Sequence, residues 1–109
     1  MPTNPDEADN VAEAPLRAER AIRSLAYATL THASLVLFGS RARGDASRRS
    51  DFDLAVIPRE GFEESEILRF SELLEQSPEI IYPIDLVDMR TTSPELREKI
   101  EREGRRWKN

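Results

Sequence analysis

A polar, arginine-rich loop between two apolar segments is the feature of this sequence that most limits its fold. The segments are ASLVLF (residues 33–38) and LAVIP (residues 54–58), and their branched apolar side chains are typical of buried strands. Gly39 ends the first strand, predicted over 34–38, and Pro58 ends the second, predicted over 51–57. The loop GSRARGDASRRSD therefore joins two strands of one domain, and both of its ends lie at strand edges.

The rest of the chain reads as helices and one more strand. Apolar residues at helical spacing predict amphipathic helices over 15–30 and 63–76. A third strand is predicted over 80–87, and its pairing is expected to begin after Pro83, which has no amide hydrogen to donate. The predicted order is helix, strand, loop, strand, helix, strand, with a final helix to follow.

That final helix has clear start and stop signals. Ser93 serves as the N-cap and Pro94 fits the first turn, where its missing amide hydrogen costs nothing. Gly104 is the expected stop, and the following RRWK segment (residues 105–108) is predicted to be the basic end of the helix.

Length and composition limit the domain organisation. The chain has 109 residues, 39% hydrophobic and 34% charged, which fits one soluble domain with a modest core. Residues 1–13 are rich in Pro, Asp, Glu and Asn and contain no Lys or Arg, so they are predicted to form a disordered acidic tail. The folded domain is expected over 14–109.

Charge and cysteine content exclude several classes of function. The chain has no cysteine, no apolar run of membrane-spanning length and no signal-peptide pattern at its start, so we expect a cytoplasmic protein that does not bind membranes. The formal net charge is −5, much of it in the first 13 residues, which argues against general nucleic-acid binding. The arginines of the loop form a local patch that suits a small anion.

Two carboxylates stand at the end of the loop, at Asp51 and Asp53. On a strand they share one face, about 6–7 Å apart along the chain, while Phe52 and Leu54 face the core. Two such carboxylates repel each other, and a divalent cation such as Mg²⁺ relieves the repulsion. Taken alone, an Asp-x-Asp pair is also compatible with an ordinary solvated strand end.

The start of the loop suits phosphate. Gly39 lets backbone approach a ligand closely, Ser40 adds a hydroxyl donor, and backbone amides at such a turn can bind phosphate oxygens. Arg41 and Arg43 supply positive charge, as do the two arginines nearer the carboxylates. A Gly-Ser pair by itself is equally compatible with an ordinary turn.

The Gly-Ser pair at the start of the loop and the Asp-x-Asp pair at its end indicate a particular protein family far more specifically together than either pair does alone. The run GSRARGDASRRSDFDLAV resembles the minimal nucleotidyltransferases of the DNA polymerase beta superfamily, in both the glycine-serine motif and the paired metal-binding aspartates. The resemblance implies an α+β fold with a small mixed β-sheet flanked by helices. It covers the chain from about Ser34 to Trp107.

The resemblance also implies a third carboxylate on a later strand, where PIDLVD offers Asp85 and Asp88. These aspartates lie three residues apart, so they face opposite sides of a strand. The family pattern of an aspartate followed by two apolar residues matches Asp85. Asp85 can join the other carboxylates if its strand lies beside that of Asp53, whereas Asp88 is expected to be a solvated strand-end residue.

The family's chemistry transfers a nucleoside monophosphate from a nucleoside triphosphate to a hydroxyl. By resemblance, Asp51, Asp53 and Asp85 are the catalytic residues and hold two Mg²⁺ ions, for which Mn²⁺ is an alternative. Gly39 and Ser40 are expected to bind the phosphates of ATP. Either Arg41 or Arg43 is expected to neutralise their charge.

The small size of the chain predicts dependence on a partner. It has no room for the acceptor domain of larger superfamily members, so it should form a homo-oligomer or use the surface of another protein. Stand-alone minimal nucleotidyltransferases resemble antitoxins paired with HEPN-type toxins, and the resemblance implies AMP transfer to a tyrosine of the toxin. The alternatives are an antitoxin that acts by occlusion without catalysis and an enzyme that modifies a small molecule.

Three further residues are given structural roles. His32 is the only histidine and is expected at the surface or at a cap. Tyr82 and Trp107 are expected to serve packing or an interface, with stacking on a base as the alternative.

Overall fold

The computed structural model describes the backbone of residues 5–109 and the side chains of residues 13–109. A four-stranded sheet with the order β3-β2-β1-β4 forms its centre. The strands are β1 (Ala33–Phe38), β2 (Phe52–Pro58), β3 (Ile84–Asp88) and β4 (Arg105–Lys108). β1 is antiparallel to both β2 and β4, whereas β2 and β3 are parallel. The expected α+β fold with a small mixed sheet is therefore confirmed.

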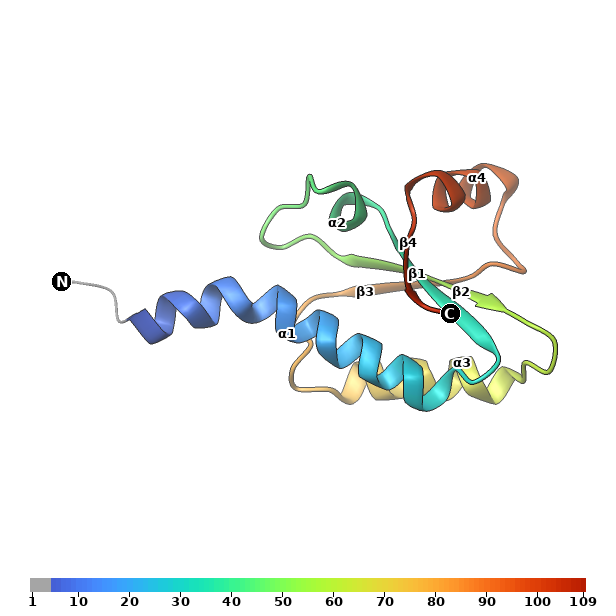
Figure 1. The fold of residues 1–109 in the computed structure, drawn as a ribbon, viewed down its shortest axis with the longest axis horizontal. Coiled ribbons are helices and arrows are strands. Elements are labelled where there is room, and N and C mark those ends of the chain that lie inside the picture. The colour runs from blue at the N-terminus through green and yellow to red at the C-terminus, as the bar shows by residue number, and fades with distance from the viewer. Residues whose placement is uncertain (1–4) are drawn as a thin grey trace.

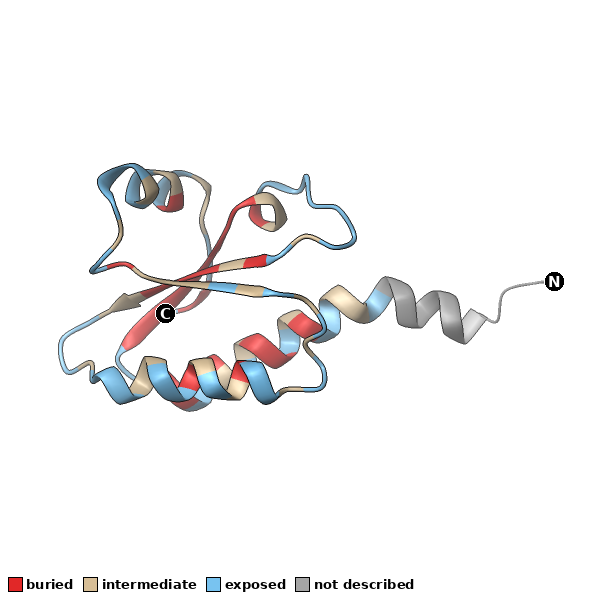
Figure 2. Ribbon diagram, turned by 180° about the vertical axis from the view of Figure 1, so that it is seen from behind, coloured by how far each residue is buried: buried red, intermediate tan, exposed pale blue. Residues whose placement is uncertain are grey.

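Helices cover both faces of this sheet (Figure 1). α1 (Pro5–Thr29) and α3 (Glu64–Gln76) lie side by side on one face, and the short α2 (Ser40–Arg43) and α4 (Pro94–Glu103) lie on the other. β1 is buried along its whole length and β2 over most of it, whereas β3 at the side of the sheet is intermediate to exposed (Figure 2). No helix in the described part of the chain is long and apolar enough to cross a membrane.

Strand alternation divides the core into two clusters. On the α1 and α3 side, Leu35, Leu37, Leu54 and other buried residues pack against the helices. On the α4 side, Val36, Phe38, Ala55, Met89 and Ile100 form a smaller cluster. Successive residues of β1 and β2 thus belong to opposite clusters, as the period of two in a strand requires.

The predicted helices are present, with differences at their boundaries. α1 begins at Pro5 rather than Pro15 and so includes part of the segment predicted to be a tail. Residues 1–4 of that tail lie outside the described residues, and the division between tail and domain at residue 13 stays a prediction. α3 begins with a reciprocal capping box between Glu63 and Glu66. The side chain of Ser93 accepts a hydrogen bond from the amide of Leu96 and caps α4 as predicted.

The prediction for residues 105–108 is wrong: they form strand β4 and not the end of the last helix. α4 stops at Gly104, where a side chain would collide with the carbonyl oxygen of Ile100 and with Val36. β4 then pairs with the free edge of β1, and Trp107 is buried against Phe52, with their rings 6.1 Å apart. Long-range pairing and the burial of one large side chain outweigh the local helical pattern.

Candidate active site

The loop between β1 and β2 and the start of β3 bring three strand ends together at one end of the sheet. β1 ends at Phe38, and β2 and β3 begin at Phe52 and Ile84. The third strand starts after Pro83, as predicted, and the carbonyl of Pro83 accepts a hydrogen bond of 3.0 Å from the amide of Phe52. The carboxylates and the Gly-Ser turn therefore meet at this end of the sheet.

Asp53 and Asp85 are register partners on the neighbouring parallel strands β2 and β3. Each lies two residues before a member of the α4-side cluster, Ala55 on β2 and Val87 on β3. Side chains two apart on a strand point the same way, so Asp53 and Asp85 share that face of the sheet. Asp51 lies exposed, one residue before β2. The strand of Asp85 therefore lies beside that of Asp53, the condition on which the selection of Asp85 depended, and the catalytic role of Asp85 stays a prediction.

The three carboxylates interact electrostatically. Burial raises the pKa of Asp53 above its usual value, and the negative charges of Asp85 and Asp51 raise it further. Lys99 of α4 and Arg43 of α2 act in the opposite direction. Lys99 belongs to this site although the sequence analysis did not select it, because only the packing of α4 against the sheet brings it near Asp53.

The backbone conformation of Gly39 and its contact with Asp53 both require a residue without a side chain. Its φ of 75° lies in the left-handed region, which residues with a side chain rarely adopt. A Cβ placed on Gly39 would collide with Oδ2 of Asp53. The backbone of the Gly-Ser turn therefore lies directly against a carboxylate of the site. Ser40 follows as the first residue of α2, whose amides at Ala42 and Arg43 donate to the carbonyl of Gly39.

Arg41 holds the strand ends in place. Its Nε and Nη2 both donate to the carbonyl oxygen of Ser50, at 3.0 and 2.7 Å. The guanidinium carbon also lies 4.3 Å from the ring centre of Phe52 and 4.7 Å from that of Tyr82. Arg41 thus connects Ser50, directly before Asp51, to Tyr82, which precedes β3. It therefore positions β2 and β3, the strands that carry Asp53 and Asp85.

Arg43 is the more exposed of the two arginines predicted to bind phosphate. Its Nε donates to Asp45 at 3.1 Å, and its Nη1 donates to Glu103 of α4 at 3.1 Å. The side chains of Asp45 and Glu103 hold Arg43 near the carboxylates of the site. There its positive charge lowers the pKa of Asp53. Arg43 is therefore better placed than Arg41 to meet a phosphate.

Asp88 lies apart from the site and is not the solvated residue expected from the sequence. Arg90 donates to both of its carboxylate oxygens, with the shortest contact at 2.7 Å, and the same guanidinium pairs with Glu64. Hydrogen bonding to Arg90 lowers the pKa of Asp88. Asp88 thus connects the end of β3 to α3.

His32, Trp107 and Tyr82 lie in positions that fit surface or packing roles. His32 is exposed, and its Nδ1 lies 3.1 Å from Glu66, next to the capping box of α3. Trp107 is buried in the α1-side core. Tyr82 packs edge-on against Phe52, with ring centres 5.5 Å apart.

The donor set of this edge fits a hard divalent cation. Asp53 and Asp85 are adjacent carboxylates, and the repulsion that raises the pKa of Asp53 is the kind that a cation removes. Mg²⁺ typically takes one or two carboxylates and completes its shell with water and substrate phosphates. Among the described residues, no three His, Cys, Asp or Glu side chains are placed so that together they could hold a metal ion.

Known proteins share this arrangement. The chain is 40% identical over 63 residues to the Haemophilus influenzae protein named probable protein adenylyltransferase MntA, a match covering 58% of this chain and 54% of that one. The match thus spans about half the length of this curated relative. A solved structure described as a candidate minimal nucleotidyltransferase is 35% identical, with a TM-score of 0.63, over 84% of this chain and 91% of that one.

A second solved structure shares the fold. It contains a tri-AMPylated Shewanella oneidensis HEPN toxin in complex with an MNT antitoxin, at 22% identity and a TM-score of 0.60, covering 86% of this chain and 71% of that chain. The family model for polymerase beta nucleotidyltransferases matches residues 22–107, from the second half of α1 to β4. The chain therefore belongs to the polymerase beta nucleotidyltransferase family.

Proposed function

We propose that this protein transfers AMP from ATP to a hydroxyl group of a partner protein, with residues 14–109 as the transferase domain. The observation that carries the proposal is the register pairing of Asp53 with Asp85 directly beside the Gly39-Ser40 turn. A site for triphosphate and a site for cations are thus adjacent at one sheet edge, which nucleotidyl transfer requires. The reaction is proposed for the cytoplasm.

Each residue has a role in this reaction. Gly39 and Ser40 bind the phosphates of ATP through backbone amides and the serine hydroxyl. Arg43 compensates phosphate charge, and Arg41 contributes mainly by holding the strand ends. Asp51, Asp53 and Asp85 would hold Mg²⁺, which supplies charge stabilisation for the attacking and leaving oxygens.

The chemical step is an in-line displacement at phosphorus. The acceptor oxygen forms a bond to the α-phosphorus while the bond from that phosphorus to the bridging oxygen breaks, and pyrophosphate leaves. The acceptor proton passes to the carboxylate of Asp85, which is exposed at the mouth of the site, and from there to water. Catalysis depends on holding the acceptor close to the α-phosphate, because the protein forms no covalent intermediate.

We further propose that the acceptor is a tyrosine of a HEPN-type toxin and that the transfer makes this protein an antitoxin. Two similarities support this step: the relative named as a protein adenylyltransferase and the solved complex that contains an AMPylated HEPN toxin. A phenol with a pKa near 10 loses its proton more readily than a serine hydroxyl, which favours tyrosine.

Co-expression with the product of the adjacent gene tests the proposal. We expect intact mass measurement to show an AMP-sized gain on the neighbour, which Asp53→Ala abolishes and the exposed-surface control Glu72→Ala preserves. A stable complex that silences the neighbour without a mass gain would overturn transfer and favour occlusion. A gain that survives Asp53→Ala would overturn the assigned site.

A further inference from the structure

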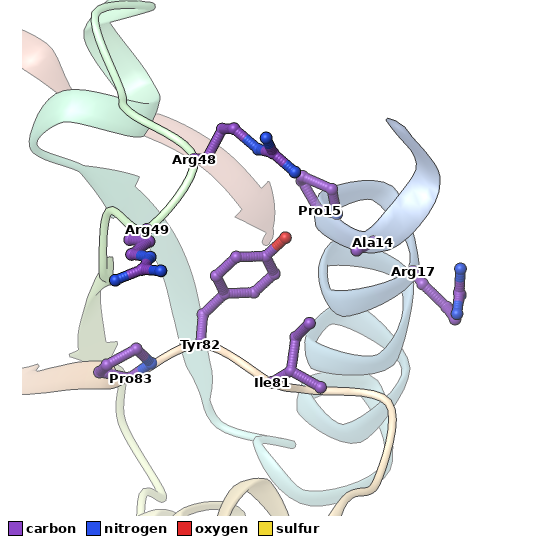
Figure 3. A pocket seen from close by; sticks show the side chains of 8 residues that line it. All are labelled: Ala14, Pro15, Arg17, Arg48, Arg49, Ile81, Tyr82 and Pro83. Carbon is purple, nitrogen blue, oxygen red and sulfur yellow. The ribbon is translucent and has the colours of Figure 1, made fainter. Parts of the chain in front are cut away.

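A pocket of about 840 Å³ opens beside the candidate active site, a volume typical of ligand-binding cavities. Three segments form its walls: α1 around Pro15, the loop after α2 at Arg48 and Arg49, and residues 81–83 before β3 (Figure 3). It lies on the α1 side of the sheet, because Tyr82 packs against the cluster on that side. The carboxylates face the other side, so the pocket is distinct from the nucleotide site.

The pocket combines an apolar floor with positive charge. Tyr82 projects into its middle, Arg48 reaches from the loop towards Pro15, and Arg49 lies on the loop side near Pro83 (Figure 3). Both arginines are exposed. No acidic side chain of the described residues lines the pocket. This concentration of one charge contrasts with the formal net charge of −5 of the whole chain.

The pocket is physically connected to the carboxylate strands. The ring of Tyr82, which lines the pocket, also lies 4.7 Å from the guanidinium carbon of Arg41. Arg41 in turn holds the carbonyl of Ser50, directly before Asp51. A protein segment seated on Tyr82 therefore lies against the element that positions the carboxylates, at the same edge of the sheet.

We propose that the pocket binds an acidic segment of the partner protein. An apolar or aromatic side chain of that segment packs on Tyr82 and on Ile81, which is 71% exposed, while its carboxylates pair with Arg48 and Arg49. Arginine forms bidentate hydrogen bonds with carboxylates, and Arg and Tyr are enriched among residues that dominate binding energy. A nucleic acid would need a basic surface that extends beyond the pocket, and the formal net charge of −5 argues against one.

This inference deepens the proposed function, because it describes the segment that the acceptor protein presents. Its test measures binding and requires no AMP transfer, so its failure and the failure of AMP transfer are distinguishable. The probe is a fluorescein-labelled peptide, EELYEE, titrated with the full chain at low salt and followed by fluorescence anisotropy. The matched peptide QQLYQQ keeps the apolar centre and removes the charge.

We expect EELYEE to bind the wild-type chain and Asp53→Asn equally, and QQLYQQ to bind at least tenfold more weakly. The double variant Arg48→Ala, Arg49→Ala should weaken EELYEE binding at least tenfold. The variant Ile81→Ser, at an exposed position where folding is not affected, should weaken both peptides. A control with the same charge change on α4 and β4, Arg102→Ala with Arg105→Ala, should stay within twofold of wild type.

Several results would overturn the inference. One is the absence of EELYEE binding at millimolar peptide, and another is binding that the substitutions at Arg48 and Arg49 leave unchanged. If AMP or a twelve-nucleotide oligo-uridine bound more tightly than the peptide and lost affinity in the same double variant, the pocket would belong to a nucleotide or RNA. Salt-sensitive dimerisation of the wild-type chain, lost in that variant, would assign the pocket to a second copy.

Discussion

Asp53 and Asp85 stand opposite each other on the parallel strands β2 and β3, with the backbone of Gly39 directly against the Asp53 carboxylate. Burial and the charges of Asp85 and Asp51 make it unfavourable for Asp53 to be ionised in the folded protein. The fold thus tolerates a local repulsion at the place where the proposed cation and triphosphate would bind.

Removing the charge of Asp53 should stabilise the protein without ligand at neutral pH. The pKa of Asp53 is raised in the folded state, so its unfavourable contribution is absent below the ordinary pKa of 3.8 and develops as the pH rises through the folded-state pKa. Asp53→Asn should therefore unfold at a higher urea concentration than wild type at pH 7, and the difference should shrink near pH 3.5. An equal difference at both pH values would contradict this electrostatic account.

Nucleotide and metal should stabilise the wild-type protein together. A non-hydrolysable ATP analogue with Mg²⁺ should raise the melting temperature, because a ligand that binds only the native state stabilises it. In the double variant Asp51→Asn, Asp53→Asn we expect the shift to disappear, and affinity for the pair of ligands to fall by about 100-fold or more. Differential scanning fluorimetry measures both, with the analogue plus EDTA as the control. No shift at millimolar ligand would argue against the site.

Gly39 should be far less replaceable than Gly44, although both have positive φ. At Gly44, with φ 86° and ψ 11°, alanine in the left-handed helical conformation costs about 1–2 kcal/mol, whereas Gly39, with φ 75° and ψ −158°, lies in a region that is essentially restricted to glycine. At Gly44 a Cβ meets no heavy atom within 4 Å, whereas at Gly39 it collides with Asp53. Gly39→Ala should therefore lose more unfolding free energy than Gly44→Ala in urea titrations, and AMP transfer as well. Equal losses would show that the turn can relax away from Asp53.

Substituting Arg41 should separate positioning from phosphate binding. Arg41→Ala removes two hydrogen bonds to Ser50 and two contacts with aromatic rings, a loss of about 2 kcal/mol in unfolding free energy. We expect kcat to fall with little change in KM for ATP, and Arg41→Lys to restore activity only in part. Arg43→Ala should instead raise KM for ATP with a smaller effect on stability. A rise in KM for Arg41→Ala with unchanged stability would mean that Arg41 binds phosphate directly.

Substitutions of Asp85 and Asp88 should have different effects, the first on AMP transfer and the second on stability. Asp85→Ala should abolish transfer, because Asp85 is the register partner of Asp53. Asp88→Ala should keep most transfer but lose stability, since Asp88 pairs with Arg90. Arg90 lowers the pKa of Asp88, so this stability is present above the ordinary pKa and is lost as the pH falls through the folded-state pKa. Kinetics and urea unfolding of both variants give the result, and the opposite pattern would require a register shifted by one residue.

Features that depend on neighbouring residues could be predicted from the sequence. The spacing from Gly39 to Asp53 identified the family, because a turn and two alternating strand positions depend only on neighbouring residues. The same holds for the cap at Ser93 and for the start of β3 after Pro83. Strand parity put Asp85 and Asp88 on opposite faces, and the resemblance to the family selected Asp85, whose strand does pair with that of Asp53.

Features that depend on contacts between distant parts of the chain could not be predicted and became visible in the fold. Residues 105–108 became a strand because the open edge of β1 and the core around Phe52 offered hydrogen bonds and burial that an extension of α4 could not supply. Arg41 proved to be a support of the strand ends because Ser50 and Tyr82 approach it from other parts of the chain. Lys99 joined the site through the packing of α4. Such contacts join residues far apart in sequence, and local propensity carries no information about them.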